Sequence, residues 1–338
     1  MRVLFTAWYN SPNTYLKDIA DSLMEEGCEV LCSKDVFWHT NVSFDIIHIQ
    51  WPEQLFTDRS FNRENLDILK KRIYFLKEQG VRFVATLHNE LPHQSNELNK
   101  ELYQFVYENV DVIIHLGYYS TRAYPHKKNT VVFHPNYNRH IQIRKVIEEG
   151  LSLSQNRFLC FGNIRNRDEE QQIIDGFLKA EIFGAELIIL NSLIGINPYG
   201  RRDLFRRFFY KRFLRKLNKR NIQLIPGKVS SDDINQYFNW TDYVISPRVN
   251  NLNSGVVFLG FSFGKIVIGP RIGNIGEFLE QHNNPTFEPL NVESISNAFK
   301  EAQEMEGVGQ KNKEFSDKSL SPEEIARQHM DVYKELLG

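Results

Sequence analysis

The sequence RFLCFGNIRNRDEEQQIIDGFLKAEIFGAELIIL, residues 157–190, decides the fold class. Residues 157–161 (RFLCF) are mostly apolar and predict a buried strand that is followed by Gly162. Residues 169–179 have the apolar spacing of an amphipathic helix, and residues 185–190 (AELIIL) predict a second buried strand. A strand, a helix and a strand in this order are typical of a parallel β–α–β unit.

The same alternation continues on both sides of this unit. Toward the N-terminus we expect strands at 2–7, 29–32, 44–50, 81–87, 110–116 and 130–133, and helices at 14–26, 65–79 and 98–108. Toward the C-terminus we expect strands at 222–225, 243–246 and 266–269, and helices at 231–238, 254–263 and 293–305. Apolar strands that alternate with amphipathic helices favour an α/β fold with doubly wound, parallel sheets.

The chain has 338 residues, more than a single hydrophobic core usually supports, so we expect two domains. A polar segment around residues 138–155 separates the two runs of alternation, and we place the boundary near residue 150. The prediction is an N-terminal Rossmann-like domain in residues 1–150 and a C-terminal one in 151–315. Within residues 316–338, Ser321 and Pro322 open a last helix that we expect to return to the N-terminal domain.

Composition excludes several classes of protein. Hydrophobic residues make up 41% and charged residues 25%, which are ordinary globular values, and the net charge of −1 gives no overall field for nucleic acid. The three cysteines form no paired motif, which favours reduced thiols and a cytoplasmic location. The sequence begins directly with a strand pattern instead of a signal peptide, and no apolar run approaches the ~20 residues of a membrane span.

Polar residues follow the predicted strands of the N-terminal half, where ligands of open α/β sheets bind. Histidine and carboxylate side chains at such positions are candidates for a general base. An alternative for His88 is a hydrogen bond that caps the sheet, and an alternative for His134 is packing between the domains. The candidates at these strand ends are Trp51, Glu53, His88, Glu90, His93 and His134.

Three segments of the C-terminal half combine glycine, arginine and a helix start. A glycine allows a ligand to approach the backbone, and a helix N-terminus offers free amide groups to a phosphate. Two arginines at neighbouring strand ends could each bind a pyrophosphate with two hydrogen bonds. Either arginine alone is more typical of a surface ion pair. The residues concerned are Gly162, Arg165, Arg248, Asn253, Ser254 and Gly255.

Two phosphate-binding motifs and a metal motif are missing from the sequence. The dinucleotide fingerprint G-x-G-x-x-G and the phosphate loop G-x-x-x-x-G-K-[ST] do not occur, which weighs against a dehydrogenase or a nucleoside triphosphatase. The first half has no Asp-x-Asp pair and its histidines are scattered, so we expect no metal site.

Residues 201–221 (RRDLFRRFFYKRFLRKLNKRN) contain ten lysines and arginines between aromatic and leucine residues. The apolar residues of this segment recur near helical spacing, at Phe205, Phe208, Phe209, Phe213 and Leu217. A basic amphipathic helix of this kind favours contact with a membrane surface. The alternatives are a solvated helix that packs on its domain through the aromatic stripe, and, more weakly, RNA binding.

The C-terminal half resembles the donor domain of GT-B glycosyltransferases. The resemblance runs through FGNIR (161–165), SSDDINQYFNWTDYVISPR (230–248) and NSGVVFLGFSFGKIVIGPRIG (253–273). It implies that Arg165, Arg248, Ser254 and Gly255 hold the nucleotide diphosphate. It also implies that the nucleotide base lies near Gly227, Lys228 and Val229.

The N-terminal half looks like the acceptor domain of one GT-B subgroup, bacterial polysaccharide transferases of the β-mannosyltransferase type. The motifs are IIHIQWPE (46–53), VATLHNELPH (84–93) and VVFHPNY (131–137). The resemblance therefore covers most of the chain and implies two Rossmann-like domains that face a central cleft.

The departures from the family's pattern bear on mechanism. Common retaining GT-B enzymes carry two glutamates eight positions apart, where this sequence has Asn251 and Leu259. The resemblance thus favours inversion, with His88 as the base that activates the acceptor and Glu90 as second candidate. Since arginines and a helix would hold the phosphates, we expect the reaction to need no metal.

The expected function is transfer of a hexose from a GDP- or UDP-linked sugar to a lipid-linked or polysaccharide acceptor. The basic helix would attach the enzyme peripherally to the inner face of the membrane, with no nucleic acid as partner. One alternative is a non-catalytic subunit that binds a nucleotide sugar or a glycan. Another is a sugar-nucleotide epimerase with the same two domains.

Overall fold

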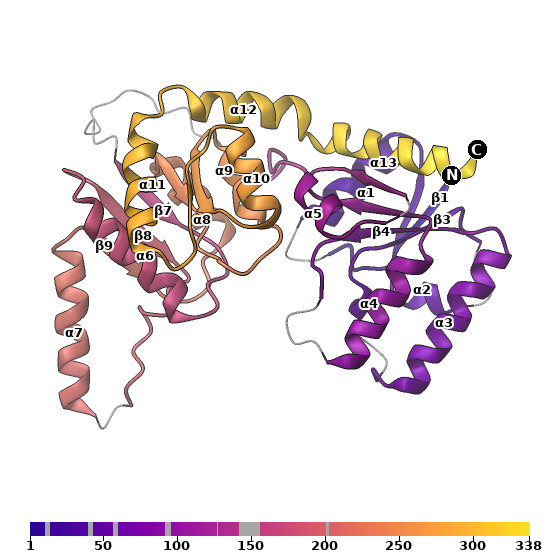
Figure 1. The fold of residues 1–338 in the computed structure, drawn as a ribbon, viewed down its shortest axis with the longest axis horizontal. Helices are drawn as coiled ribbons and strands as arrows, with labels where there is room; N and C mark the ends of the chain where they lie inside the picture. The colour runs from indigo at the N-terminus through magenta and orange to yellow at the C-terminus, as the bar shows by residue number, and fades with distance from the viewer. Residues whose placement is uncertain are drawn as a thin grey trace. The chain divides into compact units, whose positions relative to one another are not determined.

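The computed structural model describes residues 1–10, 14–39, 43–56, 60–91, 96–126, 128–141, 156–200 and 203–338. The chain forms two compact units (Figure 1). The N-terminal unit comprises Met1–Pro135 and Lys318–Gly338, and the C-terminal unit comprises Asn136–Asp317. The expected boundary near residue 150 lies outside the described residues.

The N-terminal unit is built on a six-stranded parallel sheet in the order β2-β1-β3-β4-β5-β6. The strands are β1 (Arg2–Phe5), β2 (Glu29–Cys32), β3 (Ile46–Ile49), β4 (Arg82–Leu87), β5 (Val112–His115) and β6 (Asn129–Val131). The helices are α1 (Tyr15–Glu25), α2 (Asp35–Trp38), η1 (Pro52–Phe56), α3 (Arg63–Glu78), α4 (Glu97–Asn109), α5 (Tyr118–Ala123) and α13 (Pro322–Leu337).

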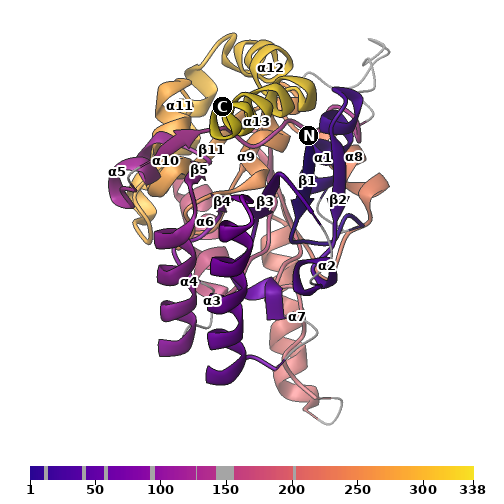
Figure 2. The same cartoon turned by 90° about the vertical axis from the view of Figure 1, so that its right-hand side faces the viewer.

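Helix α13, the last element of the chain, belongs to the N-terminal unit. Ile325, Ala326 and Tyr333 are buried in its core together with strand residues such as Val3. The hydroxyl of Tyr333 lies 2.6 Å from Nδ1 of His48 on β3. Figure 2 shows α13 and α1 side by side, and this packing closes one face of the sheet with the last residues of the chain.

The C-terminal unit repeats the design with a parallel sheet in the order β12-β11-β10-β7-β8-β9. Its strands are β7 (Arg157–Cys160), β8 (Glu186–Leu190), β9 (Ile222–Ile225), β10 (Tyr243–Ile245), β11 (Ile266–Pro270) and β12 (Thr286–Phe287). Its helices are α6 (Arg167–Ala180), α7 (Leu204–Asn218), α8 (Ser231–Trp240), α9 (Gly255–Ser262), α10 (Gly273–Gln281), α11 (Val292–Glu304) and α12 (Val308–Ser319).

Side-chain caps and small residues set the helices of the C-terminal unit. Asn166 caps α6 by accepting a hydrogen bond from the backbone N–H of Glu169 at 2.8 Å. Gly176 lets α6 approach α11 closely, because a Cβ at this position would lie 2.3 Å from Cγ2 of Ile295. A larger residue would force the two helices apart, so their packing depends on this glycine.

All strands within each sheet are parallel, so their carboxyl ends meet at one edge. The loops after β7, β8, β9, β10 and β11 therefore share one edge of the C-terminal sheet. The loops after β3, β4, β5 and β6 share the corresponding edge of the N-terminal sheet. These two edges hold almost all of the residues singled out in the sequence.

Candidate functional site

Arg248 is the centre of the candidate site in the C-terminal unit. It follows β10, and its side chain is half-buried. Its Nε atom is buried and has no hydrogen-bond partner within the part of the chain that the structure describes. Burial lowers the pKa of Arg248 below its usual value, the charge of Arg165 lowers it further, and Glu169 opposes the shift. A half-buried guanidinium whose Nε lacks a partner in the described chain, with a second cation nearby, favours binding of an anion.

Arg165 approaches this point from the neighbouring strand β7. The chain leaves the strand at Gly162, which adopts a positive φ of 143°. A Cβ on Gly162 would lie 3.5 Å from side-chain atoms of Pro247 and Val256, so the loops after β7 and β10 and the first turn of α9 lie close together. The Arg165 side chain is exposed and therefore able to contact a ligand.

The N-terminus of α9 completes this group. Ser254 is the N-cap residue, but its side chain does not cap the helix, and its Oγ lies 3.1 Å from Oγ of Ser246. The first backbone amides of the helix, beginning at Gly255, consequently receive no side-chain cap. Uncapped amides and the positive end of the helix dipole favour a phosphate at this position.

Asn253 fixes the start of α9 to the start of α10. Its Oδ1 accepts a hydrogen bond from Nδ2 of Asn274 at 2.7 Å, and its carbonyl accepts one from Nδ2 of Asn251. The N–H of Asn274 also donates to the carbonyl of Leu252 at 3.1 Å. Asn253 is thus a residue that positions the loop, and Asn251 is turned toward the backbone.

Two buried glutamates that sequence reasoning missed hold the arginine loop and the loop beside it. Glu169 Oε2 accepts a hydrogen bond from the N–H of Arg165 at 2.9 Å. Glu170 accepts one from the hydroxyl of Ser192 and two, each at 2.8 Å, from the N–H groups of Leu193 and Ile194. In the sequence these glutamates stand as a pair of acidic residues in the first turn of a capped helix. Acidic residues at such a place are usually explained by their interaction with the helix dipole.

Lys228 and Val229 follow β9 at the same edge of the sheet. Gly227 turns the chain there with a φ of 83°. Lys228 is exposed and Val229 is half-buried. Strand β8 stands between β9 and β7, so the loop after β8 separates this segment from the arginine loops.

His88 is the centre of the candidate site in the N-terminal unit. It follows β4, and its Nε2–H donates to Oε1 of Gln50 at 2.8 Å. Its ring stacks on Trp51 with centroids 4.3 Å apart and an interplanar angle of 18°. Burial lowers the pKa of His88 to about 3, and the nearby His134 adds to the shift. The imidazole is therefore neutral at physiological pH.

Tyr15 links His88 to His134. Its ring meets His88 edge-on at 5.1 Å and lies 4.8 Å from the ring of His134. His134 donates from Nδ1 to the carbonyl of Pro135 at 2.6 Å, and burial lowers its pKa to about 4. The structure thus brings Trp51, His88 and His134 together, with Tyr15 as a member that the sequence pattern did not reveal.

Glu53 and Glu90 have partners of their own outside this aromatic group. Glu53 accepts a hydrogen bond at 2.5 Å from the hydroxyl of Tyr103 on α4. Glu90 is exposed and accepts one at 2.8 Å from Tyr124, next to α5. His93 lies outside the described residues.

No metal centre is found in the ranges that the structure describes, since no group of three or more His, Cys, Asp or Glu side chains is arranged to hold an ion. Likewise, no described helix is both long and apolar enough to cross a bilayer.

Solved structures similar to this chain include several glycosyltransferases and a candidate UDP-N-acetylglucosamine 2-epimerase from Listeria monocytogenes. Sucrose-phosphate synthase from Thermosynechococcus elongatus is 14% identical, with a TM-score of 0.68 over 99% of this chain and 98% of its own. Anabaena HepE in complex with UDP-glucose is 15% identical, with a TM-score of 0.64 over 99% and 100%. The catalytic domain of Arabidopsis thaliana starch synthase IV, bound to ADP and acarbose, is 9% identical, with a TM-score of 0.66 over 99% of both chains.

Neither a protein-family model nor a curated protein sequence matches the chain. The identities above establish the architecture alone. With two parallel six-stranded sheets and interleaved helices, the chain has the GT-B fold, as predicted.

Proposed function

We propose that this protein is a glycosyltransferase that moves a hexose from a nucleoside-diphosphate sugar to an acceptor hydroxyl. The observation that carries the proposal is the half-buried Arg248, whose Nε lacks a partner in the described chain, beside Arg165 and the uncapped start of α9. Such a group is suited to a diphosphate, which supplies the negative charge that both arginines need.

The similar structures support a nucleotide sugar as the donor. HepE is in complex with UDP-glucose, and starch synthase IV is bound to ADP, on the same fold. We propose a UDP- or GDP-linked hexose here. The base would lie toward Lys228 and Val229, since the chain turns at Gly227 on the same sheet edge.

The chemistry proposed for the donor is departure of the nucleoside diphosphate. As the bond between the anomeric carbon and the phosphate oxygen breaks, negative charge grows on the diphosphate. Arg165, Arg248 and the amides at Ser254 and Gly255 would stabilise that charge, with no metal required. Glu169 would act on this step indirectly, because it holds the backbone of Arg165.

The proposed base is His88, with Glu90 as second candidate. The acceptor oxygen would form a bond to the anomeric carbon and give its proton to the imidazole, with inversion at that carbon. A pKa of about 3 keeps the imidazole unprotonated and ready to accept, although it makes the free enzyme's base weak.

We propose a lipid-linked acceptor or a polysaccharide, as in transferases of the β-mannosyltransferase type. The support is the set of sequence motifs around Trp51, His88 and His134, which the structure gathers into one aromatic group. Tyr15 and His134 are buried in this group, whereas Trp51 and His88 are half-buried and are the rings that could contact the apolar face of a sugar.

The test is product analysis with UDP- and GDP-hexoses, with and without a mixture of lipid-linked and oligosaccharide acceptors. We expect release of nucleoside diphosphate together with a glycosylated acceptor. Conversion of the donor sugar without acceptor would indicate an epimerase instead. Donor binding without release under any acceptor would indicate a binding subunit.

A variant pair sharpens the test. Arg248→Met should weaken donor binding by roughly 10- to 100-fold. Arg271→Met removes an arginine that also follows a strand of this sheet but already pairs with Glu280 and Glu288, at 2.7 and 3.0 Å. Equal binding by the two variants would contradict the assignment of Arg248.

A further inference from the structure

Helix α7 differs from the other helices of the C-terminal unit in how little of it is covered. Its C-terminal end packs on the sheet through the buried Leu217, and the hydroxyl of Tyr210 donates to the carbonyl of Ile194 at 2.8 Å. Its N-terminal turns project away from the sheet of their own unit (Figures 1 and 2). The helix is therefore anchored at one end and open to solvent at the other.

The projecting turns carry large apolar side chains on the solvent side. Leu204 is 74% exposed, Phe205 73%, Phe208 59% and Phe209 49%. A helix of this composition could instead pack on its own domain through the aromatic stripe, yet its first two turns present that stripe to water. A contiguous exposed apolar patch on a folded unit indicates a surface that another phase or molecule covers.

Basic residues follow the apolar tip along the helix. The exposed cations behind it are Lys211, Arg212, Arg215, Lys216, Lys219 and Arg220. Asp203 is the one acidic residue of 203–221, and it is engaged as the N-cap, accepting from the N–H of Arg206 at 3.1 Å. The charge of this segment thus contrasts with the net charge of −1 for the whole chain.

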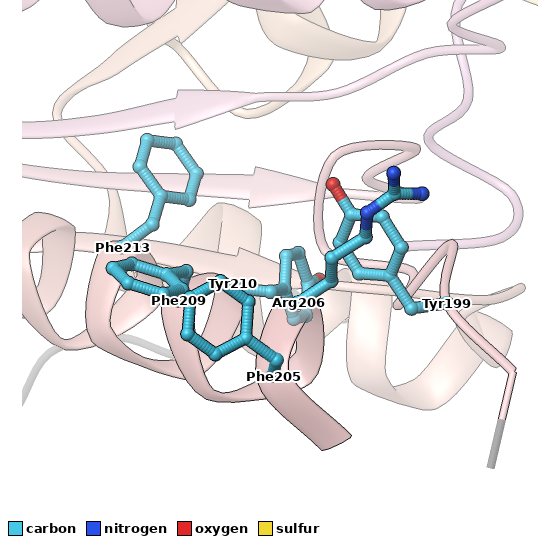
Figure 3. A pocket seen from close by; sticks show the side chains of 6 residues that line it. All are labelled: Tyr199, Phe205, Arg206, Phe209, Tyr210 and Phe213. Carbon is cyan, nitrogen blue, oxygen red and sulfur yellow. The ribbon is translucent and has the colours of Figure 1, made fainter. Parts of the chain in front are cut away.

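The aromatic surface continues into a shallow hollow of about 410 Å³ beside the helix (Figure 3). Phe205, Phe209 and Phe213 follow one another along α7, and the Phe205 and Phe209 rings lie 4.8 Å apart. Tyr199, from the segment before the helix, lies under the guanidinium of Arg206 at 5.9 Å. Rings and cations are thus interleaved at the tip.

We propose that α7 docks the protein on an anionic lipid bilayer, with the aromatic tip at the level of the acyl boundary and the basic turns among the phosphate headgroups. The large aromatic side chains gather in the first turns, where Arg206 lies among them, and most of the exposed cations lie in the later turns, which matches the depth order of a bilayer surface. Aromatic side chains favour this interface, and lysine and arginine near it are attracted to anionic lipids. This surface is separate from the diphosphate site, so the proposal stands independently of the proposed reaction.

The test is co-sedimentation of the full chain with vesicles of phosphatidylcholine alone and of phosphatidylcholine mixed with phosphatidylglycerol. We expect binding to the anionic vesicles, weakened by salt, and at most about one tenth of that affinity for the neutral ones. The double variants Phe205→Ser/Phe208→Ser and Arg212→Glu/Lys216→Glu should each lower the affinity about tenfold or more.

Two matched control variants distinguish binding through α7 from non-specific adsorption to vesicles. Phe183→Ser removes a ring that is 96% exposed on the same unit, and Lys300→Glu reverses an exposed charge on α11. Both should bind vesicles like the unchanged chain, and all variants should keep its unfolding temperature. Equal binding to both vesicle types, or equal losses in the controls, would overturn the proposal. Binding of single-stranded RNA or of a second copy of the chain by α7, with no binding of vesicles, would also overturn the proposal.

Discussion

The carboxyl edges of the two sheets have the same architecture but hold opposite kinds of polar group. In the C-terminal unit, two arginines lie near each other, and Arg248 keeps a buried nitrogen without a partner in the described chain. In the N-terminal unit, His88 and His134 are neutral and packed on aromatic rings. One edge is cationic, while the other presents uncharged imidazoles among aromatic rings.

In the reaction that we propose, the two edges therefore have separable tasks, diphosphate binding at one edge and proton transfer at the other. Changes at one edge should then leave the task of the other intact. The following experiments test whether the two edges can be changed independently of each other.

The largest expected effect is acid unfolding of the N-terminal unit. Burial lowers the pKa of His115 and His329 to about 4, and that of His48 well below its usual value. Below about pH 6.5 these histidines bind protons in the unfolded chain but stay unprotonated in the folded unit. Their contribution to the free energy of unfolding is therefore complete above that pH and is lost as the pH falls toward 4. The protonation of His115 and that of His329 in the unfolded chain each cost the folded unit roughly 2 kcal/mol at about pH 5.

Hydrogen exchange read by mass spectrometry at neutral pH and at about pH 5 would follow both units separately. The C-terminal unit should change less, since His282 is the one histidine of its described residues with a lowered pKa. Hydrogen exchange that increases at a higher pH in the C-terminal unit than in the N-terminal unit would contradict the assignment of acid sensitivity to the buried histidines of the N-terminal unit.

His88→Ala should lower kcat by about 10²- to 10⁴-fold, the usual contribution of a general base. Nucleoside diphosphate affinity should stay within about twofold, because the change lies on the other sheet. The measurement is steady-state release of diphosphate beside calorimetric titration. Normal turnover would remove His88 from the mechanism and leave Glu90, for which Glu90→Gln is the next variant.

Arg248→Met should weaken binding of nucleoside diphosphate by roughly 10- to 100-fold, since hydrogen bonds to charged groups contribute about 1.5–3 kcal/mol. The variant should also keep its free energy of unfolding. In the unchanged chain the Arg248 guanidinium is half-buried and its Nε has no hydrogen-bond partner among the described residues, so its removal should not destabilise the fold. Unchanged affinity together with lower stability would mean that Arg248 is a structural residue.

The smallest effect expected is that of the cap on α6. Asn166→Ala and Asn62→Ala each remove an N-cap hydrogen bond, at 2.8 and 2.9 Å, and should cost about 1 kcal/mol of unfolding free energy. Only Asn166→Ala should also weaken diphosphate binding, by about two- to threefold, because α6 carries Glu169. Equal affinities in the two variants would show that the capped turn does not position Arg165.

Much of the fold could be predicted because its strands are short apolar runs that end at glycine or at polar residues. The helix expected at 14–26 is α1 (Tyr15–Glu25), and the helix expected at 169–179 lies within α6 (Arg167–Ala180). Helix α12 (Val308–Ser319) was not predicted, because its buried face includes Asn312 and Ser316 instead of an apolar stripe. Asn312 is satisfied there by the carbonyl of Lys265 at 2.8 Å, a contact that no periodicity reveals.

The candidate site divides in the same way. Arg165, Arg248 and His88 could be found because each follows a recognisable strand. Tyr15, Glu169 and Glu170 could not, since their roles depend on partners from other segments. The exposure of Phe205 and Phe208 was also beyond the sequence, because helical spacing alone does not tell a packed stripe from an open one.

The most direct test of the central claim is thermal unfolding with UDP, GDP, ADP and CMP, each with and without EDTA. A ligand at about 100 times its dissociation constant should add about 2.7 kcal/mol of stability. We predict a rise in unfolding temperature with UDP or GDP that EDTA does not change and that Arg248→Met reduces to about half or less. No rise with any of the four nucleotides would contradict the diphosphate site and, with it, the proposed transfer reaction.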